Sequence, residues 1–156
     1  MDKNEIMRLA AAEAEKTMRE NIGGPFGAAI VKDGKLIAVA SNTVLRDSDP
    51  SAHAEVNAIR KAGRILQTHD LSGCEIYATG YPCPMCLSAI IWANIKKVYY
   101  GCEAWEAEKA GFRDDMIYDY LEKNRKDENL LKLDQVGHDD CERLYEEYTK
   151  EKKTVY

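Results

Sequence analysis

The segment Pro82-Cys83-Pro84-Met85-Cys86 separates a strand-like run, Cys74 to Thr79, from a helix-like run that reaches about Asn94. Pro84 suits the first turn of a helix, because the first helical residues need no backbone N–H donor. Two thiols at CxxC spacing in such a turn can point at one metal ion, and the positive end of the helix dipole favours their ionised form. The stretch therefore predicts a strand, a turn and a helix that carries two metal ligands.

A third candidate ligand lies at the start of an earlier predicted helix, which begins around Ser51 to His53 and runs to about Leu66. His53 can complete three protein ligands to zinc, with water in the fourth position of a tetrahedron. Zinc would lower the pKa of that water to about 7. Glu55 would then move protons as a general acid and base instead of binding the metal. Two thiolates and an imidazole favour zinc over iron or copper.

The remaining predicted elements form a layered pattern. Apolar spacing and turn residues predict a first helix from Ile6 to Met18, strands at Phe26–Val31, Lys35–Ala40, Cys74–Thr79, Lys97–Gly101 and Leu131–Val136, and helices at Asp114–Lys123 and Asp139–Lys152. Asp33-Gly34 joins the first two strands, because this dipeptide tolerates the positive φ of a tight hairpin. The alternation that follows the hairpin indicates an α/β domain.

Length and composition fit one globular domain. The chain has 156 residues, of which 45% are hydrophobic and 31% charged, and this is enough to bury a core without disulfides. No stretch approaches the roughly 20 apolar residues of a membrane span, and the N-terminus lacks the pattern of a secretory signal. Five cysteines, two of them in CxxC, fit reduced thiols and metal ligation. We therefore expect a cytoplasmic protein with no membrane partner.

The charge balance argues against a phosphate-rich partner. The chain has 22 basic and 27 acidic residues and a formal net charge of −5. Basic residues gather at Lys96-Lys97 and from Lys150 to Lys153, but acidic residues are interspersed through most of the basic stretches, so we interpret them as solvated surface. A small neutral substrate is expected, and not a nucleic acid.

The pair His53-x-Glu55 and Pro82-Cys83-x-x-Cys86 is the motif of zinc-dependent nucleobase deaminases. The chain resembles the cytidine deaminase superfamily, and most closely its bacterial guanine deaminase group, over nearly its whole length. The similar stretches also include Gly23–Ala28, Asp33-Gly34, Asn42, Asp49–Val56, Ala58–Arg60, Trp92-Ala93 and Ala110–Asp115. The resemblance implies a single three-layer α/β/α domain, residues 1–156, with a central five-stranded mixed sheet. It also implies a homodimer whose swapped C-terminal segment closes the partner's active site.

The resemblance further implies a base-binding pocket, with substrate contacts from Phe26, Asn42, Ala54, Trp92, Asp114 and Tyr156. Phe26 would stack on the purine, Asn42 would hydrogen-bond a ring atom, and Asp114 would recognise the base edge. Trp92 would line the pocket, and Tyr156 would cap the site of the neighbouring subunit. Taken without the resemblance, the same residues could be core, a strand end, a helix N-cap or a chain terminus.

The expected reaction is hydrolytic deamination of guanine to xanthine with release of ammonia. Relatives commonly have Glu immediately before the Pro-Cys pair, whereas this chain has Tyr81. Another aminopurine, cytosine or an aminotriazine are therefore alternative substrates. A tRNA-specific adenosine deaminase is a second alternative, although Asp139-Asp140 and Glu146-Glu147 make the terminal helix acidic and unsuited to RNA. A non-catalytic zinc-binding protein is the third alternative.

Overall fold

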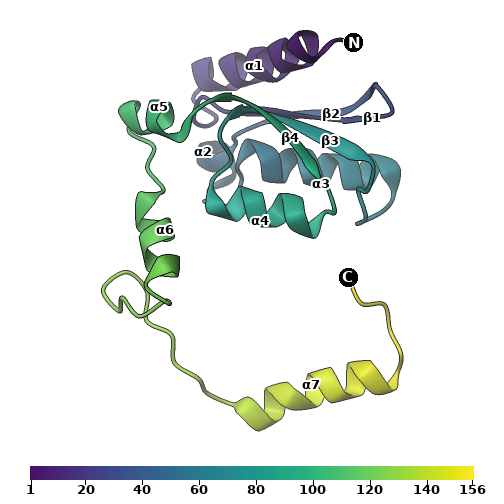
Figure 1. Ribbon diagram of the computed structural model, residues 1–156, viewed down its shortest axis with the longest axis vertical. Helices are drawn as coiled ribbons and strands as arrows, with labels where there is room; N and C mark the ends of the chain where they lie inside the picture. The colour runs from purple at the N-terminus through teal and green to yellow at the C-terminus, as the bar shows by residue number, and fades with distance from the viewer. The chain divides into compact units, whose positions relative to one another are not determined.

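The computed structural model describes all 156 residues and divides into two compact units, Met1–Asp114 and Asp115–Tyr156. The first unit contains the strands β1 (Gly27–Lys32), β2 (Lys35–Ser41), β3 (Cys74–Gly80) and β4 (Lys97–Cys102), and the helices α1 (Lys3–Arg19), α2 (Val44–Asp47), α3 (Ala54–Leu66), α4 (Pro84–Trp92) and α5 (Ala104–Lys109). The second unit contains α6 (Asp115–Glu122) and α7 (His138–Lys150) (Figure 1).

The four strands form one mixed sheet in the order β2-β1-β3-β4. β1 pairs antiparallel with both β2 and β3, and β3 pairs parallel with β4. Asp33 and Gly34, at the hairpin between β1 and β2, have φ of 49° and 73°, as a tight turn requires. The predicted hairpin is therefore confirmed. The parallel pair is connected by α4, because parallel strands need a crossover.

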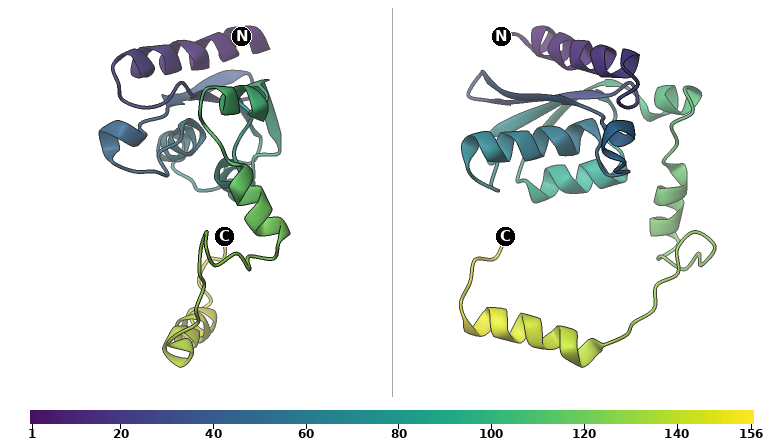
Figure 2. Two further views of the ribbon diagram at one scale, coloured as in Figure 1. Left: turned by 90° about the vertical axis from the view of Figure 1, so that its left-hand side faces the viewer. Right: turned by 180° about the vertical axis from the view of Figure 1, so that it is seen from behind.

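Helices cover both faces of the sheet in the first unit. α1 packs on one face, and α3 and α4 lie on the other (Figures 1 and 2). The central strand β1 is buried on both faces of the sheet. Ala28 and Ile30 pack towards α3 and α4, and Ala29 and Val31 pack in the cluster that includes residues of α1. Alternating side chains of a central strand contribute to both cores. The predicted three-layer α/β arrangement is confirmed.

The segments that carry the candidate site residues lie together at one end of the strands of the sheet. Because β1 runs antiparallel to β2 and β3, the start of β1 lies beside the ends of the other two strands. Phe26 precedes β1 and Asn42 follows β2, while α4 begins shortly after β3. The topology thus brings together residues that lie far apart in the sequence.

The predicted fifth strand at Leu131–Val136 is wrong, since the sheet has four strands. Leu131, Leu133 and Val136 are 53%, 63% and 89% exposed. Alternating apolar residues form a strand only where a neighbouring strand accepts their backbone hydrogen bonds, and this segment pairs with none. The short helices α2 and α5 were not predicted, because four and six residues are too few to show a helical period. None of the helices has the length and hydropathy of a membrane-spanning segment.

Candidate active site

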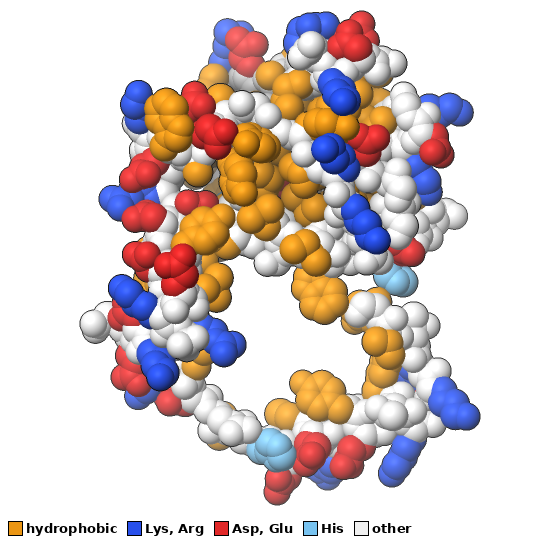
Figure 3. Space-filling model, in the orientation of Figure 1, with side chains coloured by type: hydrophobic (Ala, Val, Ile, Leu, Met, Phe, Trp, Pro, Cys, Tyr) orange, Lys and Arg blue, Asp and Glu red, His pale blue; other side chains and the backbone are white.

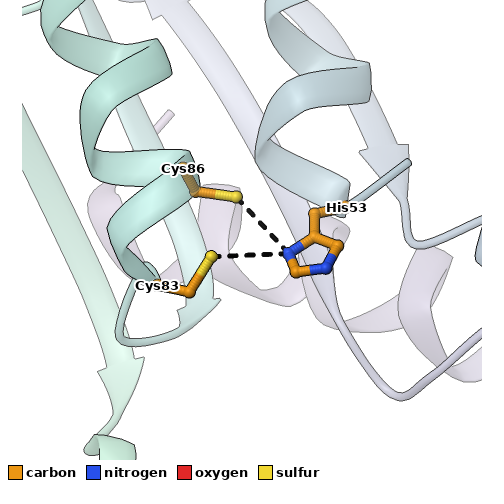
Figure 4. A group of neighbouring side chains, drawn as sticks. All are labelled: His53, Cys83 and Cys86. Carbon is orange, nitrogen blue, oxygen red and sulfur yellow. Dashed lines mark hydrogen bonds between the residues drawn. The ribbon is translucent and has the colours of Figure 1, made fainter. Parts of the chain in front are cut away.

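Three potential metal ligands converge where α3 and α4 begin. The Nδ1 atom of His53 lies 3.6 Å from Sγ of Cys83 and 3.6 Å from Sγ of Cys86 (Figure 4), and the three ligand atoms lie within 4.8 Å of one another. Bonds of roughly 2.0 to 2.3 Å in a tetrahedron place ligand atoms about 3.4 to 3.8 Å apart. The spacing therefore fits a zinc ion held by these three side chains.

The helix starts explain why these side chains face one another. His53 is the N-cap of α3 and Cys83 is the N-cap of α4, yet neither side chain bonds to the N–H groups of its own helix. Both side chains are directed to the common centre instead (Figure 4). Cys86 follows in the first turn of α4, after Pro84 at the position predicted for it. The unpaired N–H groups and dipoles of the two helices favour negative charge, and hence thiolates, at this point.

The thiols are already polarised without a metal. A hydrogen bond from the Cys86 thiol, with a further one from His53, lowers the pKa of Cys83 to about 4. The same bond with Cys83, together with burial, raises the pKa of Cys86. The bond with Cys83 also raises the pKa of His53. One thiolate is therefore ready to bind a metal, and the remaining protons leave as the metal binds.

Glu55 lies beside the ligands without joining them. It sits in the first turn of α3, is 7% exposed and lines the same cavity. Burial raises the pKa of its carboxyl group, because a low-dielectric environment disfavours the charged form. A raised pKa makes the carboxylate a stronger base, which suits a group that must accept a proton and later return it.

A cavity of about 210 Å³ opens next to the ligand cluster. Its lining comes from the ends of strands, the starts of helices and the segment around α5: Phe26, Asn42, His53, Glu55, Gly80, Tyr81, Cys83, Ala104, Ala107, Phe112, Arg113 and Asp114. Pockets for drug-sized ligands measure roughly 300 to 1,000 Å³. The smaller cavity suits a single heterocyclic base better than a base with a sugar attached.

The Asn42 side chain is fixed in one orientation. Its Oδ1 atom accepts hydrogen bonds from the backbone N–H groups of Gly24, at 3.3 Å, and Val44, at 3.1 Å. Since both partners are donors, the oxygen must face them, and the NH₂ group remains to donate to a ligand. A Cβ atom on Gly23 would lie 2.2 Å from the Asn42 carbonyl oxygen. Gly23 therefore makes room for this residue.

Aromatic rings form part of the cavity wall. The rings of Phe26 and Phe112 pack edge to face, with centroids 5.0 Å apart and an interplanar angle of 86°. Tyr81 packs in the same manner against Tyr100, at 5.0 Å and 73°. Such pairs hold rings in place. Phe112 belongs to the Ala110–Asp115 stretch noted in the sequence, but neither it nor Arg113 was singled out as a cavity residue there.

The structure separates the predicted substrate contacts into two groups. Phe26, Asn42 and Asp114 line the cavity together with the zinc-ligand cluster. Within the first unit, Ala54 and Trp92 do not line it. Ala54 is fully buried at the start of α3, and Trp92 is 72% exposed at the end of α4. Tyr156 is 80% exposed in the second unit.

The α/β/α layers, the ligand cluster, the buried carboxyl group and the base-sized cavity together define a zinc-dependent hydrolytic deaminase. Residues 1–102 match the family described as the cytidine and deoxycytidylate deaminase zinc-binding region. The chain belongs to this family.

Similar proteins include deaminases of two kinds. Guanine deaminase of Bacillus subtilis (strain 168) is 44% identical over 130 residues, which cover 83% of each chain. The X-ray structure of guanine deaminase from Bacillus subtilis superposes with a TM-score of 0.88 and 38% identity, covering 100% of this chain and 99% of that one. The tRNA-specific adenosine deaminase of Aquifex aeolicus (strain VF5) is 42% identical over 100 residues, which cover 64% of this chain and 66% of that protein.

Proposed function

We propose that the protein hydrolyses guanine to xanthine and ammonia. The observation that carries this proposal is the cavity of about 210 Å³ in which Glu55 lies beside the zinc-ligand cluster. Support for guanine comes from the similarity to guanine deaminase, which covers 83% of this chain, compared with 64% for the tRNA-specific relative from Aquifex aeolicus.

The chain's residues divide the chemistry between them. When bound by His53, Cys83 and Cys86, zinc supplies a Lewis acid that lowers the pKa of water to about 7. Glu55 accepts a proton from the attacking water and delivers it to the ring nitrogen beside the carbon that bears the amine. It then transfers the second proton to the departing amine. One water is consumed, one ammonia leaves, and the carbonyl of xanthine replaces the amine.

Three residues of the cavity would hold the base. The ring of Phe26, supported by Phe112, offers a flat apolar surface for stacking. The NH₂ group of Asn42, fixed by the two bonds to its oxygen, can donate to a ring nitrogen or carbonyl oxygen. The Asp114 carboxylate can accept from a base N–H. A donor and an acceptor in one cavity allow the site to select one base edge.

A tRNA substrate has less support. The net charge is −5, and α7 carries Asp139 and Asp140 in its first turn. An acidic surface repels the phosphate backbone, on which most of the affinity for RNA depends. Complex formation with tRNA that weakens steeply as salt increases would favour this alternative over guanine.

We also propose that the protein is a cytoplasmic homodimer in which both units belong to one domain, 1–156. Hydrophobic side chains gather over β4 and α4 (Figure 3), where Ile91 and Trp92 are each 72% exposed. β4 is an edge strand, and Tyr120 is the one buried residue of the Asp115–Tyr156 unit. An exposed apolar face and an unpaired strand edge are stabilised when another chain covers them. In the proposed dimer the C-terminal segment crosses to the partner, and Tyr156 closes the partner's site.

Tyr81 bears on the identity of the base, because it lines the cavity. Its ring is supported by Tyr100, whose hydroxyl donates to Glu103 at 3.1 Å. We propose that the cavity still accepts guanine with this tyrosine ring in its lining.

Ammonia release from guanine, guanosine, adenine, cytosine, cytidine and ammeline by the zinc-loaded protein tests the assignment. We expect guanine to exceed the others by at least about a hundredfold in kcat/KM. Preference for another base would reject guanine but retain the zinc chemistry. No turnover of any compound would reject the proposal and favour tRNA or a non-catalytic role.

A further inference from the structure

Asn57 lies on α3, two residues after Glu55, and its side chain bonds to neighbouring loops. The Nδ2 atom is 2.9 Å from the Ser41 carbonyl oxygen, 2.9 Å from Oγ1 of Thr43 and 3.3 Å from the Ala52 carbonyl oxygen. Because carbonyl oxygens can only accept, the NH₂ group and not the amide oxygen must face them. Two hydrogens serve three acceptors, so the longest contact is the weakest.

These acceptors belong to the two segments that carry site residues. The first two flank Asn42 in the chain, and the third immediately precedes the candidate zinc ligand His53. A backbone bond of 3.0 Å, from the N–H of Thr43 to the carbonyl oxygen of Ala52, joins the same segments directly. The Asn57 amide therefore ties the Asn42 segment to the His53 segment where they meet.

Neither segment has a side-chain capping bond at the start of the helix that follows it. Thr43 is the N-cap of α2 and His53 is the N-cap of α3, and neither makes a side-chain cap bond. α2 is four residues long, too short to fix the preceding loop by itself. The bonds from Asn57 thus act across the chain where capping bonds are missing.

We propose that Asn57 is a positioning residue for the deamination, which holds the Asn42 amide in place relative to His53 and Glu55. This inference rests on the proposed function of the site. Asn57 does not line the cavity, so it acts through Asn42. Its loss should weaken base binding more than it slows the chemical step. Glu55 lies within α3 and Cys86 within α4, and the backbone bond from Thr43 to Ala52 remains beside His53.

Lys61 provides a matched control one turn further along α3. Its Nζ atom donates to the carbonyl oxygen of Val39 at 3.1 Å, so it also ties α3 to the backbone of β2. This bond lies within the strand and not beside Asn42. Lys61→Met therefore removes a comparable bond without disturbing the Asn42 segment.

The test is a double-mutant cycle with Asn57→Ala, Asn42→Ala and the double variant, using the base that the wild type deaminates fastest. We expect Asn57→Ala to raise KM about tenfold with kcat within about threefold, and Lys61→Met to change neither. Asn42→Ala should raise KM much less in the Asn57→Ala background than in the wild type, because the contact between the Asn42 amide and the base is already lost there. Independent, multiplicative effects on KM would overturn the proposal.

Two further measurements keep the test decisive. Asn57→Asp keeps the shape of the side chain but cannot donate, so it should also raise KM; a wild-type KM for this variant would overturn the proposal. Calorimetric titration with the reaction product should show its Kd rise by a similar factor at unchanged zinc content. If the preferred base proves not to be guanine, the proposed substrate fails while this cycle still decides the role of Asn57.

Discussion

Among single residues, the proposed mechanism depends most directly on Glu55. Since Glu55 lies outside the ligand cluster and is the proposed carrier of the proton transfers, Glu55→Gln should lower kcat by about a thousandfold or more while zinc stays at one ion per chain. Ammonia release and atomic absorption check both parts. Glu15→Gln is the matched control, because Glu15 is exposed on α1 and pairs with Arg19. A Glu55→Gln protein that retained zinc and turned over within tenfold of wild type would refute the shuttle.

Gly23 is a second residue whose replacement should affect the site. A Cβ atom there would lie 2.2 Å from the carbonyl oxygen of Asn42 and 2.4 Å from the Oδ1 atom of Asn42. Alanine must therefore displace the amide that we propose binds the base. We expect Gly23→Ala to lower the unfolding temperature and to raise KM about tenfold or more. Gly63→Ala, within α3, should leave KM unchanged. Kinetics and thermal melts of both variants test the prediction, which an unaltered KM in Gly23→Ala would contradict.

At the scale of elements, the turn before α3 should make stability depend on pH. Hydrogen bonds from the hydroxyl and N–H groups of Ser51, at 2.7 and 2.8 Å, lower the pKa of Asp49. A lowered folded-state pKa adds stability above the unfolded value of about 3.9, and this stability is lost as pH falls through the folded value. Asp49→Asn should therefore melt below wild type at pH 7, with a difference that shrinks towards pH 3. An equal difference at both pH values would exclude this account.

Helices and strands that are marked by characteristic turn or capping residues could be predicted from the sequence. Those that depend on a distant pairing partner could not. Asp33-Gly34 identified the hairpin, and Pro84 the start of α4, because turn and first-turn chemistry is encoded in one or two residues. The convergence of His53, Cys83 and Cys86 was predictable from the spacing of their motif. The strand expected at Leu131–Val136 failed because strand formation needs a pairing partner, which alternation alone does not supply.

The cavity lining was less predictable than the ligands. Phe112 and Arg113 line the cavity only because the segment around α5 lies beside the zinc-ligand cluster. The bonds of Asn57 to residues 41–43 likewise depend on how α3 packs against β2. Such contacts are set by tertiary structure and leave no periodic trace in the sequence.

At the scale of the whole molecule, the exposed face of α4 should hold two subunits together. We expect sedimentation to give about twice the chain mass, and Ile91→Glu to shift the protein to monomers with reduced turnover, because a charge cannot be buried unpaired in an interface. Ile65→Glu is the control, since Ile65 is 52% exposed near the end of α3. A wild-type protein that sediments as a fully active monomer would contradict the dimer.

Everything proposed for this site depends on a zinc ion, held by His53, Cys83 and Cys86, that enables hydrolysis of guanine. The most direct measurement strips the metal with a chelator, adds zinc back in known amounts, and follows ammonia and xanthine from guanine. From this dependence on zinc we predict negligible turnover without the metal, a linear rise that ends at one ion per chain, and equal amounts of the two products. Turnover that survives complete removal of zinc, or none in the fully loaded protein, would contradict it.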